Sequence, residues 1–414
     1  MERKNILITG AGIAGPTLAY WLTRSGHKVT LVEKASAPRL GGQNIDISDA
    51  AIDIVRLMGI EKEILRHNTT EVGLHIVNKD NQVEAEFPKD APLSFTSKYE
   101  ILRGDLADIL IQLTRSKVDY RFGDSIESLT QYAEGVEVVF SSKTRQRFDL
   151  LIVAEGVSSA TRKMIVPDKN PYKYLGVYTS YTTIPRQPHD GKWARWLTAP
   201  KGRVLLLRPD NKGTTRASVN YWHDGPPEAH FSASEAVAEV QRKLQGVVWE
   251  EDRLMNDIKN DKDIYLGPVS QVRLQSWSKG RCCLLGDAAY CPTPFTGMGT
   301  TLAIIGAYVL AGELSRSDNY ESAFREYESK LKPFVQKIQK VFPGQFRLVY
   351  PQSKAGVFIF NKVLSFFASK PVQKIAQALK KKPSETREFK LPHYQFATAT
   401  YSYDSRLEQR DHNP

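Results

Sequence analysis

The segment from Asn5 to Glu33 follows one strict order: strand, glycine-rich turn, helix, strand. Asn5–Thr9 is apolar without alternation, as expected of a parallel strand buried on both faces, and it leads into Gly10-Ala-Gly12-Ile-Ala-Gly15. A helical apolar stretch and a second strand, Lys28–Glu33, follow. In this setting the three glycines permit a tight turn, close approach of a pyrophosphate, and close packing of helix on strand. The segment therefore predicts a dinucleotide-binding unit.

Glu33 closes the second strand, where its carboxylate is placed to accept hydrogen bonds from ribose 2′- and 3′-hydroxyls. It argues against a 2′-phosphate, because two negative charges would then face each other. Ala14 in the turn and Lys34 beside Glu33 belong to the same predicted contact set. The helix N-terminus adds free N–H groups and a positive dipole end for the phosphates. This motif alone does not distinguish NAD from FAD.

Two later stretches favour FAD. Asp149–Ala154 is a buried strand that ends in Glu155-Gly156-Val-Ser-Ser-Ala-Thr-Arg162, and Arg281–Leu285 is another that ends in Gly286-Asp287. Both place a glycine and a carboxylate at the carboxyl end of a strand, where open α/β sheets bind ligands. The ribityl chain of FAD needs such acceptors, and we expect Asp287 to bind a ribityl hydroxyl. The helix after the loop Pro292–Gly299 then directs its N-terminus at the pyrimidine ring of the flavin.

Together these stretches resemble the class A flavoprotein monooxygenases, which have the p-hydroxybenzoate hydroxylase fold. The family's marks are an N-terminal GxGxxG, a middle DGxxSxxR and a late GDAAHxxxPxxGxGxN. The resemblance covers residues 5 to 340 of the chain. Within the family, the chain is most similar to the tetracycline destructases and related enzymes that oxidise polycyclic compounds. The supporting strings are GPTLAYWL, RLGGQNID, EILRGDL, WSKGR, GAYVLAGEL and, near the end, Leu391-Pro-His-Tyr394.

The resemblance implies a role for each matching residue. The turn glycines match the family's glycines that contact the pyrophosphate. Glu33 matches the acidic residue that binds the adenosine ribose, and Asp287 matches the aspartate that binds the ribityl chain. Arg103 matches an arginine on the phosphate and ribityl region, and the late loop matches the one beside the isoalloxazine. No side chain is assigned as catalytic, because the flavin carries the reaction. The predicted cofactor-binding set is Gly10, Gly12, Ala14, Gly15, Glu33, Lys34, Arg39, Gln43, Arg103, Glu155, Asp287, Pro294, Gly297 and Gly299.

The resemblance also implies an activity. NADPH or NADH acts as a transient reductant, O2 adds at C4a, and the flavin C4a-hydroperoxide oxygenates an aromatic or polycyclic small molecule. Natural-product biosynthesis and antibiotic modification are the expected settings, with hydroxylation the expected reaction and a Baeyer–Villiger step left open.

The chain departs from the family pattern at four positions, and these departures keep other functions open. Glu155 replaces Asp, Tyr290 replaces His, Thr301 replaces Asn and Gly306 replaces a common Asp. One alternative is therefore an FAD-containing cyclase or binding protein with no net oxygenation. A flavin-dependent halogenase is another, although Trp193-Ala-Arg-Trp196 lacks the spacing of the Trp-x-Trp-x-Ile-Pro string. A flavin-free NAD(P) dehydrogenase is a third.

The predicted fold class is α/β, a Rossmann-type FAD-binding domain with an inserted mixed β-sheet substrate domain and C-terminal helices. The FAD-binding domain is expected at 1–72, 98–172 and 270–330, and the substrate domain at 73–97 and 173–269. Bridging helices, including Phe358–Lys382, occupy 331–385, and a tail 386–414. Aromatic residues of the inserted segment either pack the sheet or line a pocket for a flat substrate: Tyr174, Tyr178, Tyr181, Trp193, Trp196, Tyr221 and Trp222.

The net charge of +11 comes without a nucleic-acid motif, so the basic patch Lys370–Lys382 is interpreted as a solvated face. The three clustered cysteines imply neither a disulfide framework nor a metal site, and eight histidines are too few to favour a metallo-oxygenase. There is no room for a leader before the first strand, and the apolar run Gly356–Phe367 is too short to span a bilayer. We therefore expect a soluble cytoplasmic protein without bound metal or integral membrane segment, whose partners are a small-molecule substrate and O2 and not nucleic acid.

Overall fold

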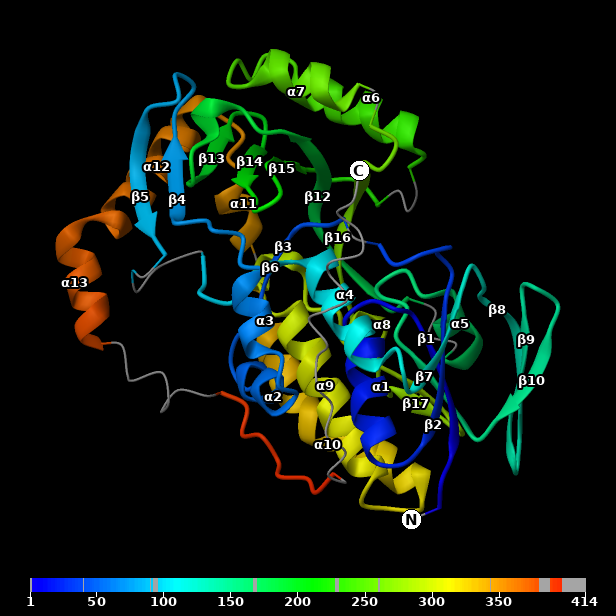
Figure 1. Cartoon of the computed structure of the whole chain (residues 1–414). Helices are drawn as coiled ribbons and strands as arrows, with labels where there is room; N and C mark the ends of the chain where they lie inside the picture. The colour runs from blue at the N-terminus through cyan, green and yellow to red at the C-terminus, as the bar shows by residue number, and fades with distance from the viewer. Residues whose placement is uncertain are drawn as a thin grey trace, which may run out of the picture.

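The computed structural model describes residues 2–39, 41–89, 91, 96–166, 170–227, 231–259, 261–342, 344–379 and 388–396. A six-stranded sheet and its helices form the lower part of the molecule in Figure 1, and a seven-stranded sheet forms the upper part. The α/β class and the inserted mixed sheet predicted from the sequence are confirmed. The exact domain boundaries stay a prediction.

The six-stranded sheet has the order β17-β18-β11-β1-β2-β7. All neighbouring pairs are parallel except β17 with β18, so the carboxyl ends of β1, β11 and β18 meet at one edge. The three cysteines are free and buried. Cys282 and Cys283 lie in β18, and Cys291 follows the short helix after that strand. The strands are β1 (Asn5–Thr9), β2 (Lys28–Glu33), β7 (Val118–Phe122), β11 (Leu150–Val153), β17 (Ser278–Lys279) and β18 (Cys282–Leu284).

A layer of helices covers this sheet. Helix α9 (Gly299–Leu314) is buried along almost its whole length and apolar on every side, as expected of a central helix. Helices α1 (Ala14–Arg24) and α10 (Tyr320–Ile338) pack against α9, and α4 (Arg103–Thr114) packs against α1. The helix that follows the glycine turn and the helix that follows the late loop are therefore direct neighbours, although about 280 residues separate them in the chain.

The short helix α8 (Asp287–Tyr290) rests on α9 at Gly306. A Cβ at Gly306 would lie 2.0 Å from the hydroxyl oxygen of Tyr290, and the Tyr327 hydroxyl is hydrogen-bonded to the same oxygen at 3.1 Å. Tyr290 and Gly306, two of the departures from the family pattern, are therefore in direct contact, and only glycine at position 306 leaves room for the tyrosine. A third departure, Thr301, accepts a hydrogen bond from the Ser48 backbone N–H at 3.0 Å and so connects α9 to the segment after β3 (Asn44–Asp46).

The seven-stranded sheet is mixed, with the order β16-β12-β15-β14-β13-β4-β5. Helices α6 (Ala233–Leu244) and α7 (Glu251–Ile258) pack against one of its faces. Tyr221 packs in the core beneath these helices, whereas Trp222 packs in a cluster on the other face, as alternation along a strand requires. The strands are β4 (Gly73–Val77), β5 (Val83–Pro88), β12 (Tyr172–Pro185), β13 (Ala194–Ala199), β14 (Arg203–Pro209), β15 (Thr214–Trp222) and β16 (Tyr265–Val272).

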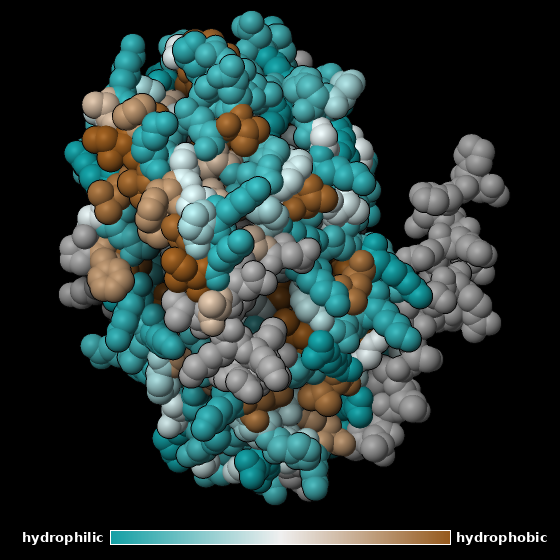
Figure 2. Space-filling view, turned by 90° about the vertical axis from the view of Figure 1, so that its left-hand side faces the viewer, coloured by the Kyte–Doolittle hydropathy of each residue, from teal (hydrophilic) through white to brown (hydrophobic). Residues whose placement is uncertain are grey.

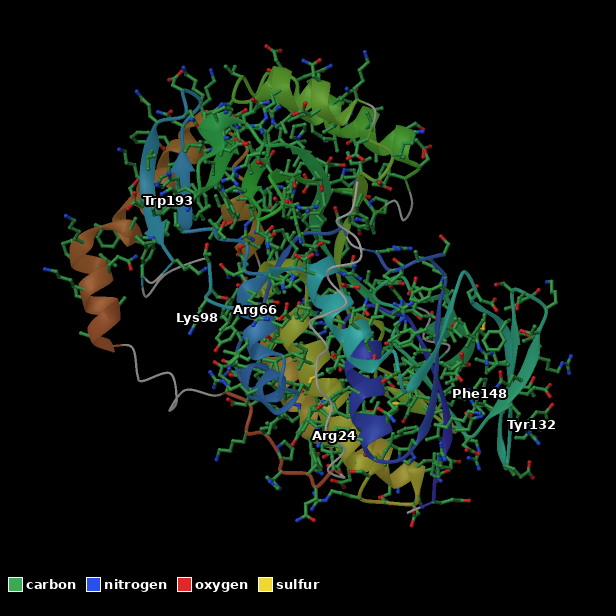
Figure 3. All side chains as sticks on the ribbon, viewed as in Figure 1. Arg24, Arg66, Lys98, Tyr132, Phe148 and Trp193 are labelled. Atoms are coloured by element: carbon green, nitrogen blue, oxygen red, sulfur yellow. The ribbon has the colours of Figure 1, made fainter. Side chains whose placement is uncertain are left out.

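Two smaller sheets complete the strands. β3 (Asn44–Asp46) pairs with β6 (Glu100–Leu102) between the two large sheets. The sheet β10-β9-β8 lies at the far side of the lower part, where Figure 3 labels Phe148 and Tyr132. The remaining elements are α2 (Ala51–Leu57), α3 (Glu61–Arg66), β8 (Ile126–Tyr132), β9 (Gly135–Phe140), β10 (Arg145–Phe148), α5 (Ala160–Ile165), the 3-10 turns Pro188–Asp190 and Pro294–Thr296, and α11 (Gln345–Val349).

The prediction of one helix over Phe358–Lys382 is wrong. The segment forms α12 (Lys354–Ala368) and α13 (Lys370–Leu379), separated by Ser369 in an extended conformation. Pro371 explains the break, because proline is tolerated in the first turn of a helix but not in its interior. Residues 380–382 lie outside the described residues, as do 386–387 and 397–414 of the predicted tail.

Residues 388–396 of the predicted tail lie along α9 and α10. The Tyr394 ring packs against Gly312, its hydroxyl donates to Glu313, and Phe389 packs against Phe334. Among the described helices, none combines the length and apolarity that crossing a bilayer requires.

The contact between Tyr290 and Gly306 predicts a coupled effect on stability. Gly306→Ala should lower the free energy of unfolding by about 1–3 kcal/mol, since the new methyl group overpacks the interface. Adding Tyr290→Phe should recover part of this loss, because the clashing hydroxyl is gone while the ring carbon Cζ would still lie 3.2 Å from the Cβ. Urea denaturation of the two single variants and the double variant measures the coupling.

Gly41→Ala is the matched control for this cycle, because a Cβ at Gly41 meets no atom within 4 Å. Strictly additive effects of Gly306→Ala and Tyr290→Phe would contradict the contact.

Candidate cofactor-binding site

The turn between β1 and α1 can be built only from glycine at two positions. Gly10 has φ +101°, and a Cβ there would lie 2.4 Å from the Ala154 carbonyl oxygen. A Cβ at Gly15 would lie 2.1 Å from the carbonyl oxygen of Gly10. Both distances are well below van der Waals contact, so a side chain at either position would push the turn away from the strand ends. The sequence-based prediction of a tight turn at Gly10 and close packing at Gly15 is confirmed.

The late motif lies directly beside this turn. The Leu285 backbone N–H donates to Val153 at 2.9 Å, which aligns the end of β18 with the end of β11. A Cβ built on Gly286 would lie 3.1 Å from the Cβ of Ala14. Asp287 follows immediately as the first residue of α8. Residues near position 10 and near position 287 are therefore close enough for one extended molecule to contact both.

Arg103 lies over the glycine turn. It is the first residue of α4, and its backbone N–H donates to the Gln43 carbonyl at 3.0 Å. Its guanidinium Nη2 lies 3.4 Å from the position that a Cβ on Gly12 would occupy, and its Cβ lies 3.2 Å from the corresponding position on Gly42. The structure thus brings the predicted residues Gly12, Gln43 and Arg103 together.

The charges at this site face one another. Burial lowers the pKa of the Arg103 guanidinium and Arg39 lowers it further, whereas Asp287 and Glu33 act in the opposite direction. Burial raises the pKa of the Asp287 carboxyl, and the positive charge of Arg103 opposes this shift. An arginine and an aspartate that are partly removed from water offer a donor for phosphate and an acceptor for hydroxyl groups.

Glu33 is fixed by two backbone donors. Its Oε2 accepts from the Ala11 N–H at 2.9 Å and its Oε1 from the Ala35 N–H at 3.0 Å. The carboxylate is thereby held against the glycine turn and keeps lone pairs for further donors. Lys34 and Arg39 next to it are exposed, so contacts of their side chains with a cofactor stay a prediction.

Glu155 has a structural role that the sequence did not reveal. Its carboxylate accepts from the Ser159 hydroxyl at 2.7 Å, from the Thr161 hydroxyl at 2.6 Å and from the Thr161 N–H at 3.1 Å. These bonds hold the N-terminus of α5, where Ser159 caps the helix. The longer side chain of glutamate reaches this turn, and its predicted contact with a cofactor remains a prediction.

Arg162 ends the middle motif and was not among the residues predicted to bind the cofactor, but it positions one of them. It is 1% exposed, and its guanidinium donates to the Ala288 carbonyl at 3.1 Å and the Val157 carbonyl at 2.9 Å. It also bonds the Tyr172 hydroxyl. Arg162 therefore fixes the backbone of α8, which carries Asp287, to the middle motif.

The late loop, residues 292–299, returns the chain to Asp287. Pro294 opens the 3-10 turn Pro294–Thr296, and Gly297 ends it in the left-handed conformation with φ +64°. Gly299 begins α9, and a Cβ there would lie 3.9 Å from the Asp287 Oδ1. The predicted loop residues are therefore next to the predicted ribityl acceptor.

Helices α1 and α9, which follow the glycine turn and the late loop, lack a side-chain cap. Neither α1 nor α9 has a capping side chain or an acidic residue in its first turn. Among the other described helices, α5, α6, α10 and α12 begin with a capping serine or asparagine, whereas α2, α3, α4, α7 and α11 lack a side-chain cap, as α1 and α9 do. Uncapped N–H groups at a helix N-terminus bind anions. The free N–H donors of α1 suit the diphosphate of FAD, the Asp287 carboxylate can accept hydrogen bonds from the ribityl hydroxyls, and the free N–H donors of α9 suit the flavin ring. The protein groups follow the same order as these three parts of FAD, so the residues fit FAD.

An aromatic group borders the late loop. The Phe295 ring lies 5.0 Å from the Phe346 ring and 6.2 Å from the Tyr350 ring, centroid to centroid. Tyr350 is buried, and its hydroxyl has no hydrogen-bond partner among the described residues. On the neighbouring sheet, Tyr181 stacks on Tyr265 at 6.0 Å. Of the aromatic residues predicted either to pack the sheet or to line a pocket, Tyr174, Tyr178 and Tyr221 pack the sheet beneath α6 and α7.

A buried charged cluster joins the two-stranded sheet to the seven-stranded one. Arg208 on β14 donates to both Glu71 oxygens at 3.0 Å and also pairs with Glu100 on β6. Asp46 on β3 is electrostatically coupled to this group, and its Oδ1 is buried without a partner among the described residues. Burial and the charge of Glu100 raise the pKa of the Asp46 and Glu71 carboxyls, while Arg208 opposes the rise. One arginine therefore faces three carboxyl groups.

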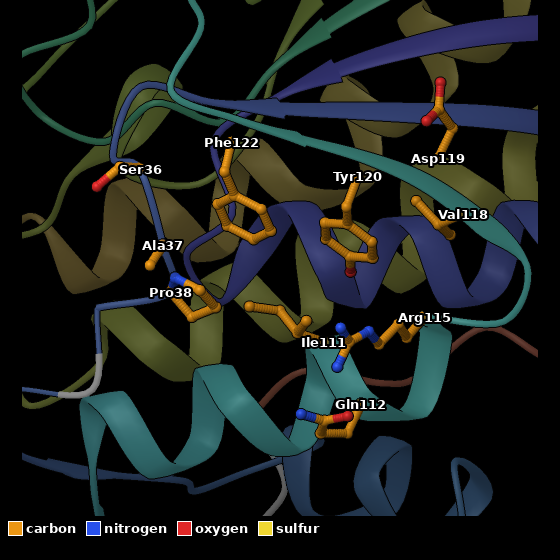
Figure 4. Close-up of a pocket in the computed structure, with 10 residues that line it drawn as sticks. All are labelled: Ser36, Ala37, Pro38, Ile111, Gln112, Arg115, Val118, Asp119, Tyr120 and Phe122. Carbon is orange, nitrogen blue, oxygen red and sulfur yellow. The ribbon is translucent and has the colours of Figure 1, made fainter.

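A pocket of about 460 Å³ lies beside the end of β2, between the loop after that strand, α4 and β7 (Figure 4). It contains none of the residues predicted to bind the cofactor. It is lined by Ser36, Ala37, Pro38, Ile111, Gln112, Arg115, Val118, Asp119, Tyr120 and Phe122.

His189, Asp190 and Glu250 are the one group of potential metal ligands found among the described residues. Arg195 and Arg253 donate to Asp190, and Arg195 also donates to Glu250 at 2.7 Å. Because these guanidinium groups already neutralise the carboxylates, the cluster is assigned as an ion-pair network.

Comparisons with known proteins agree with this geometry. The sequence matches the family described as FAD binding domain over residues 3–341. It is 34% identical over 426 residues to the flavin-dependent monooxygenase eupH of Phoma sp, covering 95% of this chain and 98% of that protein. It is 32% identical over 400 residues to the FAD-dependent monooxygenase asL4 of Sarocladium schorii, covering 89% and 93%.

A solved structure shows the same fold with related sequence. The crystal structure of the tetracycline destructase Tet(51) superposes with a TM-score of 0.78 and 30% identity, covering 95% of this chain and 100% of that one. The expected resemblance to this group of enzymes is confirmed.

Asp287→Ala should weaken FAD binding about 10- to 100-fold, because a charge-assisted hydrogen bond to a ribityl hydroxyl contributes roughly 1.5–3 kcal/mol. Quenching of flavin fluorescence on titration of the apoprotein measures the dissociation constant. Asp252→Ala, which removes an exposed carboxylate on α7, is the matched control. Unchanged flavin content in the Asp287 variant would contradict the assigned role.

The charged cluster predicts a pH dependence of stability. Folding raises the pKa of Asp46, so the folded state binds protons more tightly than the unfolded state does. The free energy of unfolding therefore falls as the pH rises from about 4, the pKa in the unfolded chain, through the pKa in the folded protein. Asp46→Asn removes this loss. In urea denaturation, the stability of the variant relative to the wild type should therefore rise as the pH increases above about 4. A stability difference that stays constant over this range would refute the assignment.

Proposed function

The chain belongs to the family of flavin-dependent monooxygenases that share the FAD binding domain, and from this membership we propose that it oxygenates an aromatic or polycyclic small molecule with NADPH or NADH and O2. The proposed settings are natural-product biosynthesis and antibiotic modification. The contact of Gly286 with Ala14, which brings Asp287 to the glycine turn, is the observation that carries the cofactor assignment.

We assign the cofactor contacts along the length of FAD. The turn from Gly10 to Gly15 and the free N–H groups of α1 hold the diphosphate, with Arg103 supplying positive charge above them. Glu33, anchored by two backbone N–H groups, directs its remaining lone pairs at the adenosine ribose. Asp287 accepts from the ribityl chain, and Arg162 keeps it in position through the Ala288 carbonyl.

Bound FAD supplies a group that NAD(P)H reduces by two electrons and that then activates O2. The chain's own contribution is to bind, orient and exclude water. The uncapped N-terminus of α9 places a positive dipole end beside the late loop, where it would favour negative charge on a bound flavin. The apolar, fully buried body of α9 keeps water from that side of the site.

The aromatic group beside the late loop supports an aromatic substrate. Phe295, Phe346 and Tyr350 offer ring faces and edges next to the loop that precedes α9. Flat ligands stack well on such surfaces. The unpartnered hydroxyl of Tyr350 provides one polar contact for a substrate hydroxyl or carbonyl. The three free, buried cysteines support a reducing, cytoplasmic location.

The departures from the family pattern do not favour the cyclase alternative. Tyr290 and Gly306 fit each other in the core, and Thr301 replaces the lost amide by a hydrogen bond to Ser48. These residues adjust packing and leave the contacts proposed for FAD in place.

The purified protein should carry a yellow flavin, and an aromatic polycyclic substrate should stimulate NAD(P)H oxidation with matching O2 consumption. With ¹⁸O2, mass spectrometry should find one labelled oxygen in the product. Flavin binding with substrate turnover but no labelled oxygen would refute monooxygenation in favour of non-oxidative chemistry. Asp252→Ala serves again as the control variant with unchanged coupling.

A further inference from the structure

Helix α12 carries an exposed apolar face. The outward positions recur every three or four residues, so they share one side of the helix. Five large apolar side chains on this side are between 44% and 63% exposed, a degree of exposure that needs an explanation when it is contiguous. They are Phe358, Ile359, Val363, Phe366 and Phe367. Together with Ile375 of α13, which is 61% exposed, they are called here the outer face.

The opposite side of α12 is firmly attached to the seven-stranded sheet. Asn361 donates to the Glu84 carboxylate at 2.6 Å, and Ser365 donates to the Glu84 carbonyl at 2.8 Å. Leu364 and Ala368 pack against the apolar cluster under β4 and β5. The orientation of α12 is therefore fixed by its own contacts, and the outer face is directed away from the protein.

The charged residues of the segment that carries the outer face all have one sign. From Lys354 to Lys382 the sequence contains seven lysines and neither aspartate nor glutamate. Lys354, Lys362, Lys370 and Lys374 are exposed on α12 and α13. Figure 2, which views this side of the molecule, shows apolar side chains interspersed with hydrophilic ones. Aromatic and aliphatic side chains beside lysines, without acids, form the pattern of helices that lie in a membrane interface.

We propose that the outer face docks the enzyme on an anionic lipid surface, with α12 lying in the plane of the headgroups. The phenylalanines enter the boundary between headgroups and acyl chains, and the lysines contact anionic headgroups. A second copy of this chain fits less well, because a two-fold interface would place the lysines of this segment opposite the same lysines of the other copy. Docking through α12 turns the β4–β5 edge of the seven-stranded sheet toward the lipid.

Flotation of the full-length, FAD-loaded protein with vesicles tests this proposal. Vesicles of phosphatidylcholine with 30% phosphatidylserine should bind the protein at least about tenfold more strongly than pure phosphatidylcholine vesicles, and added salt should weaken the binding. The double variant Phe358→Ser, Phe366→Ser should reduce the partition coefficient at least about tenfold. Lys362→Glu with Lys374→Glu should abolish the preference for anionic lipid.

Leu57→Ser and Lys262→Glu, an exposed apolar residue and an exposed lysine elsewhere, are matched controls and should bind as the wild type does. Flavin absorbance shows that each variant is folded. Absence of binding to anionic vesicles, or equal binding by the outer-face variants, overturns the proposal. A dimer in analytical ultracentrifugation that the phenylalanine variant converts to monomer would assign the face to a second copy instead and equally overturns it.

Discussion

The whole site depends on the absence of a side chain at Gly10 and Gly15. Because these residues have no Cβ, the chain can turn within contact of the Ala154 carbonyl and start α1 directly at the edge where β1, β11 and β18 end. The same close approach brings Gly286 against Ala14. With no capping side chain at α1 or α9, two helix N-termini stay available to a ligand at that edge. The glycine turn is local in sequence, but it allows residues near position 10 and residues near position 287 to lie at the same edge of the sheet.

The parts that the sequence predicted well are those governed by local rules. A buried strand followed by glycine and an acid must place that acid at the carboxyl edge of a parallel sheet, and Asp287 lies there. The assignment of Arg103 came instead from the family resemblance, and the structure adds that this arginine begins α4 and lies over the glycine turn. For Asp287, neighbouring residues in the sequence sufficed to determine the position.

Features that depend on pairs of distant residues could not be predicted in this way. Tyr290 and Gly306 each looked like a lost functional group, and only their contact shows that one accommodates the other. The donors that Glu155 and Arg162 find, and the division of aromatic residues between core and loop, likewise follow from tertiary packing. Pro371 indicates the break before α13, but the apolar residues on both sides of this proline led to the prediction of one continuous helix.

The deep placement of the thiols has a chemical consequence for an enzyme that consumes oxygen. Burial raises the pKa of Cys282 to about 12 and holds the pKa values of Cys283 and Cys291 well above the ordinary value, so these sulfurs stay protonated at neutral pH. Oxidants attack the thiolate rather than the thiol. Hydrogen peroxide that escapes during turnover therefore meets these three cysteines as protonated, unreactive thiols.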